Sequence, residues 1–417
     1  MTYLDSYNRL RELLSEDSPF ILFDDLAIYR QTFRSASQDL LPGREDYRCR
    51  IHKLQFCKGK TMQHDIGDMD DMIHIPDNAI CQNETFSYPV FMPANQKRAG
   101  RAIFLLHGFN EKNWDKYLPW ARHLALRTKS AVILFPIAFH MNRTLEVWSN
   151  RRKMYQLCEK RKKRFPQLSG SSLTNVAISM RLHNMPQRFI WSGLQTYADI
   201  IRLIQSCKEG SHPLISPDAA FHFTAYSIGC LLGEILKFTN PNGWFTHSRL
   251  ALFCGGAVFN RMSPVSRYIL DSEANIALYS FLIEHMGKNL EQDPRLRHYI
   301  QGPHPEGPVF HAMLDYHKNR DYRENLIRRC SRDILAISLK QDSIIPPYEV
   351  VNTLQGASRD IPVKIDILDF PFAYNHVTPF PPSVREQDAV NEKFSLVFDR
   401  IASFILGNDK PDAEEAG

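Results

Sequence analysis

A strand-like run that leads straight into a serine flanked by small residues is the feature that constrains this chain most. Residues 221–226 are apolar and β-prone, Ser227 follows, and Cys230–Leu236 reads as a helix. Ala225 and Gly229, two positions to either side of the serine, are small enough to let strand and helix approach closely. The pattern predicts a strand, a sharp turn and a helix. Such a turn presents a nucleophilic serine to an acyl group, whereas the ordinary alternative is a serine that caps a helix.

Apolar runs that alternate with helix-like segments fill most of the chain after residue 82. The runs that predict buried strands are 102–106, 131–135, 221–226, 250–256, 333–339 and 363–368, and the other helix-like segments are 118–126, 192–206 and 391–404. This alternation is typical of an α/β protein whose mostly parallel central sheet is flanked by helices. Residues 86–93 predict an edge strand, because Pro89 lacks the N–H that a central strand needs.

The first 80 residues form an N-terminal accessory region with weaker periodicity. Near-helical spacing of Tyr3, Tyr7 and Leu10 predicts an amphipathic helix there. An acidic stretch with flanking histidines contains His64, Asp65, Asp68, Asp70, Asp71 and His74. Its spacing does not match a calcium loop, so a solvated loop is expected more than a metal site. The sequence leaves open whether this region folds separately or packs on the main domain, which is expected over 81–406.

Two long insertions, at about 140–190 and 259–325, interrupt the alternation. Each follows the carboxyl end of a predicted strand, which is the edge where α/β sheets bind ligands, so both are candidate lid or cap elements. The first carries the basic run Lys160–Arg164, which is either a solvated helix face or an attraction for an anionic substrate or partner. The second is aromatic, and its Tyr268, Tyr279, Phe281 and Phe310, with the later Phe380, line either an acyl pocket or an ordinary core. The polar, acidic tail 407–417 is expected to be disordered.

Acyl transfer by a serine also needs an acid and a base at the same sheet edge. Asp342 lies just past the strand 333–339, in a loop that Pro346 and Pro347 restrict, and is the candidate acid. Asp333 begins that strand and would point toward the opposite edge. His376 follows the last predicted strand and is the candidate base. A loop or capping aspartate and a surface histidine are the alternatives for these two positions.

The oxyanion must be met by backbone N–H groups. The residue after the nucleophile, Ile228, supplies one candidate, and the loop after strand 102–106 supplies Phe109 as the other. Gly108 allows that loop to turn inward, and His107 is expected to brace it rather than to act as the base. Asn110 is a further supporting candidate through a side-chain contact.

The chain order Ser227, Asp342, His376 matches the α/β-hydrolase arrangement and not the chymotrypsin or subtilisin orders. With the 107–109 loop and the 225–229 turn, the chain resembles the α/β-hydrolase superfamily over about residues 82–406, and looks like a bacterial member with lid-type insertions. Where that family most often has glycine, this chain has Ala225, which is still small. The resemblance implies the α/β-hydrolase fold with helical cap insertions and an N-terminal extension.

The function that these residues predict is a serine hydrolase of the esterase, lipase or thioesterase kind. It would cleave a small-molecule acyl substrate, an ester or thioester, through an acyl-enzyme. An acyltransferase uses the same triad, and a catalytically inactive binding protein could keep the fold. The hypothesis that the protein associates with nucleic acid depends only on the basic run Lys160–Arg164. A formal net charge of only +5 disfavours it, so no nucleic acid is expected.

Composition adds mainly exclusions. The 417 residues, 43% of them hydrophobic, suffice for one large core and accessory pieces. The eight cysteines stand singly and form no C-x-x-C pair, so no zinc ribbon, metal or cofactor is expected. The N-terminus shows no secretory pattern, and no run of about 18 apolar residues predicts a membrane span. A cytoplasmic protein is therefore expected, with an oligomeric state that the sequence does not set.

Overall fold

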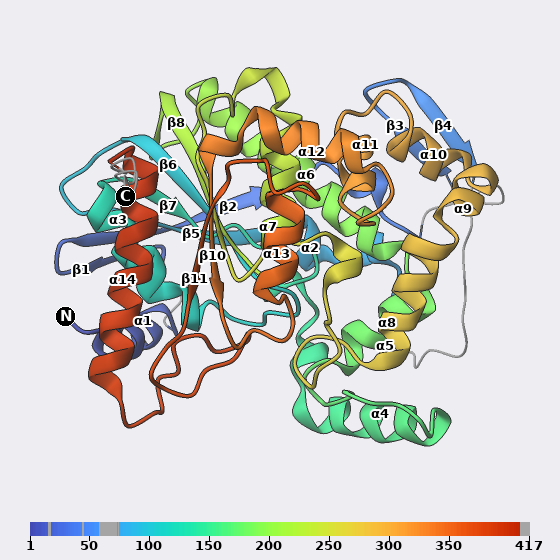
Figure 1. The fold of residues 1–417 in the computed structure, drawn as a ribbon, viewed down its shortest axis with the longest axis horizontal. Helices are drawn as coiled ribbons and strands as arrows, with labels where there is room; N and C mark the ends of the chain where they lie inside the picture. The colour runs from blue at the N-terminus through green and yellow to red at the C-terminus, as the bar shows by residue number, and fades with distance from the viewer. Residues whose placement is uncertain (16–17, 44–45, 58–72, 74, 409–417) are drawn as a thin grey trace.

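The computed structural model describes residues 1–15, 18–43, 46–57, 73 and 75–408 (Figure 1). The acidic residues and histidines between 64 and 74, and the tail from residue 409, lie outside the described residues. The predictions made for those two segments therefore remain predictions.

A nine-stranded sheet forms the centre of the molecule, in the order β1-β2-β5-β7-β6-β8-β9-β10-β11. Its strands are β1 (Phe20–Phe23), β2 (Leu26–Arg34), β5 (Thr85–Pro93), β6 (Ala99–Leu106), β7 (Ala131–Ile133), β8 (Ile215–Tyr226), β9 (Leu250–Phe253), β10 (Ile334–Leu339) and β11 (Lys364–Leu368). All neighbours from β7 to β11 pair in parallel, while β1, β2 and β5 pair antiparallel. The predicted α/β class with a mostly parallel sheet is confirmed.

Helices cover both faces of the sheet, which explains why its strands read as continuous apolar runs. Along β6, Ile103 and Leu105 enter the core beneath α1 (Tyr3–Ser15), α3 (Leu118–Thr128) and α14 (Gln387–Leu406). Phe104 and Leu106 enter the opposite core, beneath α6 (Arg188–Lys208), α7 (Ile228–Thr239) and α13 (Pro347–Leu354). Alternate side chains of one strand thus fill two cores, so neither face keeps a polar pattern.

The edge-strand prediction for residues 86–93 is wrong, because β5 lies between β2 and β7. β7 is short, and it pairs with only two residues of β5, Val90 and Phe91. Just past its end, the N–H of Leu134 donates to the carbonyl oxygen of Pro89 at 3.0 Å. Pro89 therefore lies where the ladder with β7 stops, so its missing N–H ends that ladder and does not interrupt it.

The described part of residues 1–80 packs on the main domain, which answers the question that the sequence left open. Strands β1 and β2 extend the central sheet, and α1 lies beside α3 and α14 (Figure 1). A separate two-stranded sheet, β3 (Asp46–Cys49) and β4 (Leu54–Cys57), lies beside α10 (Pro294–Ile300) at the upper right of Figure 1.

The two insertions are largely helical and contact each other. The first contains α4 (Arg151–Arg164) and α5 (Val176–Asn184). The second contains α8 (Ser272–Tyr279), α9 (Met286–Gln292), α10, α11 (Glu306–Ala312) and the start of α12 (Arg320–Arg329). The short α2 (Cys81–Glu84) lies outside both insertions and precedes β5. Arg161, from the basic run, is buried and forms a two-pronged ion pair with Asp271 at 2.7 and 2.9 Å. This member of the run therefore joins the two insertions, while Lys162 and Lys163 are exposed. None of the described helices is long and apolar enough to cross a membrane.

Candidate active site

Four parallel strands deliver the candidate residues to one edge of the sheet. β6, β8, β10 and β11 all run in the same direction, and the loops at their carboxyl ends carry Phe109, Ser227, Asp342 and His376 respectively. The structure brings the last three together. Ser227 Oγ lies 2.7 Å from His376 Nε2, and His376 Nδ1 lies 2.7 Å from Asp342 Oδ2. All three side chains are buried, which shields these contacts from water.

The turn at Ser227 has the strained backbone that the sequence predicts. Ser227 has φ 56° and ψ −127°, a conformation that non-glycine residues rarely adopt. Its N–H donates to the carbonyl oxygen of Phe253 at 3.1 Å, so β9 fixes the turn. A Cβ on Gly229 would lie 2.6 Å from the carbonyl oxygen of His107 and 2.7 Å from that of Leu106. Glycine at this position therefore permits the close approach of α7 to β6.

The carboxylate of Asp342 is held on both of its oxygens. Oδ1 accepts hydrogen bonds from the N–H groups of Ile344 and Ile345, each at 2.9 Å, and Oδ2 faces His376. This arrangement leaves the carboxylate one orientation, in which His376 donates from Nδ1 and keeps the Nε2 lone pair for Ser227. Asp333 lies at the opposite end of β10, paired with Lys237 at 2.8 Å, as its place in the sequence predicts.

The loop that carries His376 is fixed by residues that the sequence did not single out. The Tyr226 hydroxyl donates to the carbonyl oxygen of His376, and the two rings stack with centroids 5.6 Å apart. Lys116 Nζ donates to the carbonyl oxygen of Val377 at 3.0 Å and also pairs with Glu111. Tyr226 occupies the variable position of the serine motif, so the motif itself gave no signal for this role.

In the loop after β6, one backbone N–H group is hydrogen-bonded within the described part of the protein and the next is not. The N–H of Gly108 donates to the Tyr117 hydroxyl at 2.9 Å, and that hydroxyl donates to Glu111 at 2.9 Å. The N–H groups of Phe109 and Ile228, in contrast, have no acceptor among the residues that the structure describes. Two unpaired N–H groups beside Ser227 fit the oxyanion donors that the sequence predicts.

His107 has both ring nitrogens bound to the backbone. Nε2 accepts from the N–H of Ile137 at 2.9 Å, so Nδ1 carries the proton and donates to the carbonyl oxygen of Gly108 at 2.7 Å. Complete burial holds the pKa of His107 well below its usual value, and electrostatic repulsion from the neighbouring His140 lowers it further. His107 is thus a neutral imidazole that joins two loops, and neither nitrogen is available to Ser227.

Asn110 points toward the insertions and not toward an oxyanion. Its Nδ2 donates to the carbonyl oxygen of Tyr268 at 2.6 Å and to that of Thr174 at 3.2 Å. Thr174 belongs to the first insertion and Tyr268 to the second, so this one amide holds both insertions against the loop of Phe109. The local sequence gave no sign of this contact, because its two partners lie 64 and 158 residues away.

Ser227 lines two cavities, one almost entirely apolar and one partly lined by charged and polar side chains. The apolar one, about 30 Å³, is lined by hydrophobic side chains that include Phe189, Phe259, Met262 and Leu278. The polar one, about 190 Å³, is lined by Glu111, Lys112, Asn113 and Lys116 among others, and by His376. The two cavities thus give Ser227 distinct surroundings on two sides.

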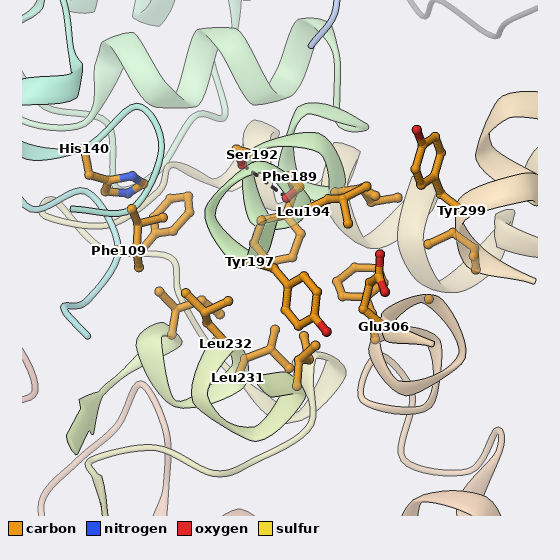
Figure 2. A pocket seen from close by; sticks show the side chains of 18 residues that line it. Phe109, His140, Phe189, Ser192, Leu194, Tyr197, Leu231, Leu232, Tyr299 and Glu306 are labelled. Atoms are coloured by element: carbon orange, nitrogen blue, oxygen red, sulfur yellow. Dashed lines mark hydrogen bonds between the residues drawn. The ribbon is translucent and has the colours of Figure 1, made fainter. Parts of the chain in front are cut away.

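A third cavity of about 90 Å³ lies behind Phe109 and Phe189 and is almost entirely apolar. In Figure 2 Phe109 and His140 close one side of it, Leu231 and Leu232 of α7 lie below, and Tyr299 and Glu306 lie at the far side. Phe109, Phe189 and Ile228 line both this cavity and the apolar cavity at Ser227. Of the five aromatics suggested for an acyl pocket, Phe310 lines this cavity and Tyr268 the polar one, whereas Phe281 and Phe380 are core and Tyr279 is exposed.

The mostly parallel sheet and the strained turn at Ser227 are those of the α/β-hydrolase fold. More narrowly, the chain belongs to the family of unknown function DUF6051, which matches residues 1–406.

Among solved structures, similar chains include a cold-adapted esterase from an Arctic intertidal metagenomic library, at 9% identity, TM-score 0.40 and coverage of 93% of this chain and 98% of that one. A thermostable esterase from Pseudomonas putida has 10% identity, TM-score 0.41 and coverage of 97% and 92%. The peroxisomal α/β-hydrolase Lpx1 from Saccharomyces cerevisiae has 14% identity, TM-score 0.37 and coverage of 95% and 94%. A comparison with curated protein sequences finds no match.

Proposed function

We propose that this protein is a serine hydrolase that cleaves a carboxylic ester through an acyl-enzyme. The observation that carries the proposal is the continuous relay from Ser227 to His376 to Asp342, with two contacts of 2.7 Å each. A serine is a weak nucleophile unless a base lies within hydrogen-bond reach and a third group orients that base. The relay supplies both.

In the proposed mechanism, His376 Nε2 takes the proton of Ser227 as its Oγ attacks the substrate carbonyl carbon. Asp342 holds the imidazole in the required tautomer and stabilises its positive charge. The N–H groups of Phe109 and Ile228 donate to the oxyanion that develops, and His376 then returns the proton to the leaving alcohol. Water repeats the sequence on the acyl-enzyme and releases the acid. Loss of one oxyanion donor lowers the rate about 100- to 1000-fold in enzymes of this kind.

The two cavities at Ser227 support a placement for the substrate. The acyl chain would occupy the apolar cavity, whose walls bear no charged side chain, and the alcohol would leave through the polar one. At about 30 Å³, the apolar cavity favours a short acyl chain. Parts of both insertions border these cavities, so we propose that together they act as a lid that keeps bulk water from the acyl-enzyme.

The test is hydrolysis of p-nitrophenyl esters of graded acyl length, measured for the wild type and Ser227→Ala. We expect activity on the shorter esters and a loss on the order of 10⁶-fold in kcat for the variant. A fluorophosphonate probe should label the wild type, and peptide mapping should place the adduct on Ser227. An unlabelled, inactive wild type would instead favour a binding protein that keeps the fold.

An acyltransferase is separated from a hydrolase by adding an acceptor alcohol to the same assay. A hydrolase should release mostly free acid, because water reaches the acyl-enzyme. If acyl transfer to the alcohol dominated at low millimolar concentration, the hydrolase assignment would be wrong while the Ser227 mechanism stood.

A further inference from the structure

Four side chains that the proposed hydrolase does not use converge on one point between the N-terminal hairpin and the second insertion. They are Cys49 at the end of β3, His52 in the turn to β4, His298 in α10, and His304 just before α11. One nitrogen or sulfur atom of each lies within 4.8 Å of the corresponding atom of every other. Cys49 and His304 are buried, and His52 and His298 are half-buried.

The spacing of these atoms is that of ligands around a tetrahedral ion. Cys49 Sγ lies 3.4 Å from His52 Nδ1 and 3.3 Å from His304 Nε2, which in turn lies 3.2 Å from His298 Nε2. A tetrahedral zinc, with Zn–S about 2.3 Å and Zn–N about 2.0–2.1 Å, places its ligand atoms about 3.3–3.6 Å apart. Three of the six distances between the ligand atoms are thus close to those of a tetrahedral zinc site, and the other three are at most 4.8 Å.

The surroundings orient the ligands as a metal requires. His304 Nδ1 lies 3.2 Å from the carboxylate of Glu306, so Nδ1 carries the proton and Nε2 turns its lone pair to the centre of the cluster. The backbone N–H of His52 points at Cys49 Sγ at 3.5 Å. A metal-ligating histidine paired with a carboxylate through its second nitrogen is a regular feature of zinc sites.

The geometry points to a structural zinc site formed by Cys49, His52, His298 and His304. Thiolate and imidazole are the ligands that zinc prefers, and four protein ligands leave no open position for catalysis. Binding releases the thiol proton of Cys49 to solvent, and the Zn²⁺–thiolate unit keeps one net positive charge, which the Glu306 carboxylate faces across His304.

The site would fasten the β3–β4 hairpin to α10 and α11. A second contact lies beside it, where the Arg295 guanidinium sits between the rings of Tyr47 and Trp191, at 3.6 and 3.7 Å from their centroids. Tyr299 follows the proposed ligand His298, and Glu306 pairs with the proposed ligand His304. Both line the cavity of Figure 2. The ion therefore fixes one wall of that cavity, whether or not Ser227 is a nucleophile.

The test is the metal content of tag-free protein purified without chelator, measured by inductively coupled plasma mass spectrometry. We expect about one zinc per chain after dialysis, and less than a tenth of that in Cys49→Ser and in His304→Ala. Cys57→Ser and His247→Ala remove an exposed cysteine and an exposed histidine, and should keep the full content. Cobalt(II) bound to the stripped wild type should give the visible bands of a tetrahedral ion and a thiolate charge-transfer band that Cys49→Ser lacks.

Wild-type protein without zinc that also fails to take up cobalt would overturn the proposal, as would zinc that survives in the folded variants. Copper or iron in place of zinc, lost in the same variants, would overturn the choice of ion. If Cys49→Ser and His304→Ala do not fold, two other measurements test the proposal. They are the zinc content of His298→Ala, a substitution at a half-buried position, and the cobalt spectrum of the wild type. Because metal content is read directly, an inactive esterase would leave this result unaffected.

Discussion

The hydroxyl of Tyr226 donates a hydrogen bond to the carbonyl oxygen of His376, so the residue before the candidate nucleophile holds the loop of the candidate base. Tyr226 is completely buried, and its ring lies nearly parallel to the imidazole, with 21° between the planes. β8 therefore positions Ser227, which follows it directly, and also positions His376 through the side chain of Tyr226. A shift of the end of β8 would displace both Ser227 and His376.

Tyr226→Phe keeps the ring and removes this hydrogen bond. We expect kcat to fall about fivefold with KM little changed, because a net hydrogen bond of about 1 kcal/mol then no longer holds the imidazole in line. Tyr3→Phe is the matched control, since Tyr3 donates to the carbonyl oxygen of Phe380 at 2.9 Å, four residues further along the same loop. Steady-state kinetics should separate the two variants. Equal kcat values would show that Tyr226 has no positioning role.

Asp342→Asn tests the candidate acid without changing its shape. The N–H groups of Ile344 and Ile345 still need an oxygen acceptor, so the amide turns its NH2 toward His376 Nδ1. This favours the wrong tautomer of His376, so we expect kcat to fall about 10⁴-fold. Asp333→Asn, at the opposite end of β10, is the control and should keep kcat, because Lys237 retains three carbonyl acceptors there. A comparable loss in both variants would point to damage to the sheet and not to the triad.

Phe189→Ala tests whether the cavity of Figure 2 can extend the acyl site. Phe189 lies between that cavity and the apolar cavity at Ser227, with its ring 6.4 Å from Phe109 and 5.3 Å from Phe259. The enlarged site should bury two further methylenes of the acyl chain, at about 0.8 kcal/mol each. This should raise the preference for longer esters about tenfold in kcat/KM. Phe259→Ala enlarges only the first cavity and should not admit the longer chains. An unchanged chain-length profile in Phe189→Ala would contradict a shared acyl path.

Glu234 on α7 gives a prediction for stability that is separate from activity. Its carboxyl group is completely buried, and neither oxygen has a hydrogen-bond partner among the described residues. Burial raises its pKa from 4.5 to about 8. Between these two values the folded chain keeps the proton while the unfolded chain has lost it, so the free energy of unfolding falls as the pH rises from about 5 to 8.

Glu234→Gln should remove this contribution, which has a limiting slope of about 1.4 kcal/mol per pH unit. We expect the variant to be more stable than the wild type at pH 8 and similar at pH 5, as measured by urea denaturation at several pH values. Glu209→Gln is an exposed control at the C-terminal cap of α6 and should follow the wild type. Parallel pH profiles for wild type and Glu234→Gln would show that the buried carboxyl does not control this dependence.

The triad geometry could be expected from the sequence because each of its parts has a local signal. Ser227 is marked by small residues around a strand–helix junction, while Asp342 and His376 each follow a recognisable buried strand. Parallel strands bring their carboxyl ends to one edge, so the local signals combine without any knowledge of long-range contacts. The sequence therefore predicts both the place of these three residues and the mostly parallel sheet, because each depends on local patterns in the chain.

What the sequence did not predict depends on contacts between distant segments. Pro89 reads as an edge residue, and only the short length of β7 makes an interior place possible for it. Arg161 reads as part of a solvated basic run until Asp271 of the other insertion is placed beside it. Likewise Cys49 with His52, and His298 with His304, are each too short a pattern to indicate a metal site, and the fold alone unites them.

The contact between Cys49 and His304 spans 255 residues of chain. At a synthesis rate of about 5 to 20 residues per second, the β3–β4 hairpin leaves the ribosome roughly 13 to 50 seconds before the helix that covers it. Throughout that interval Cys49 and the ring of Tyr47 lack the partners that bury them in the finished protein. The emerging chain thus carries an oxidisable thiol and an uncovered aromatic surface, the kind of exposure against which chaperones protect nascent proteins.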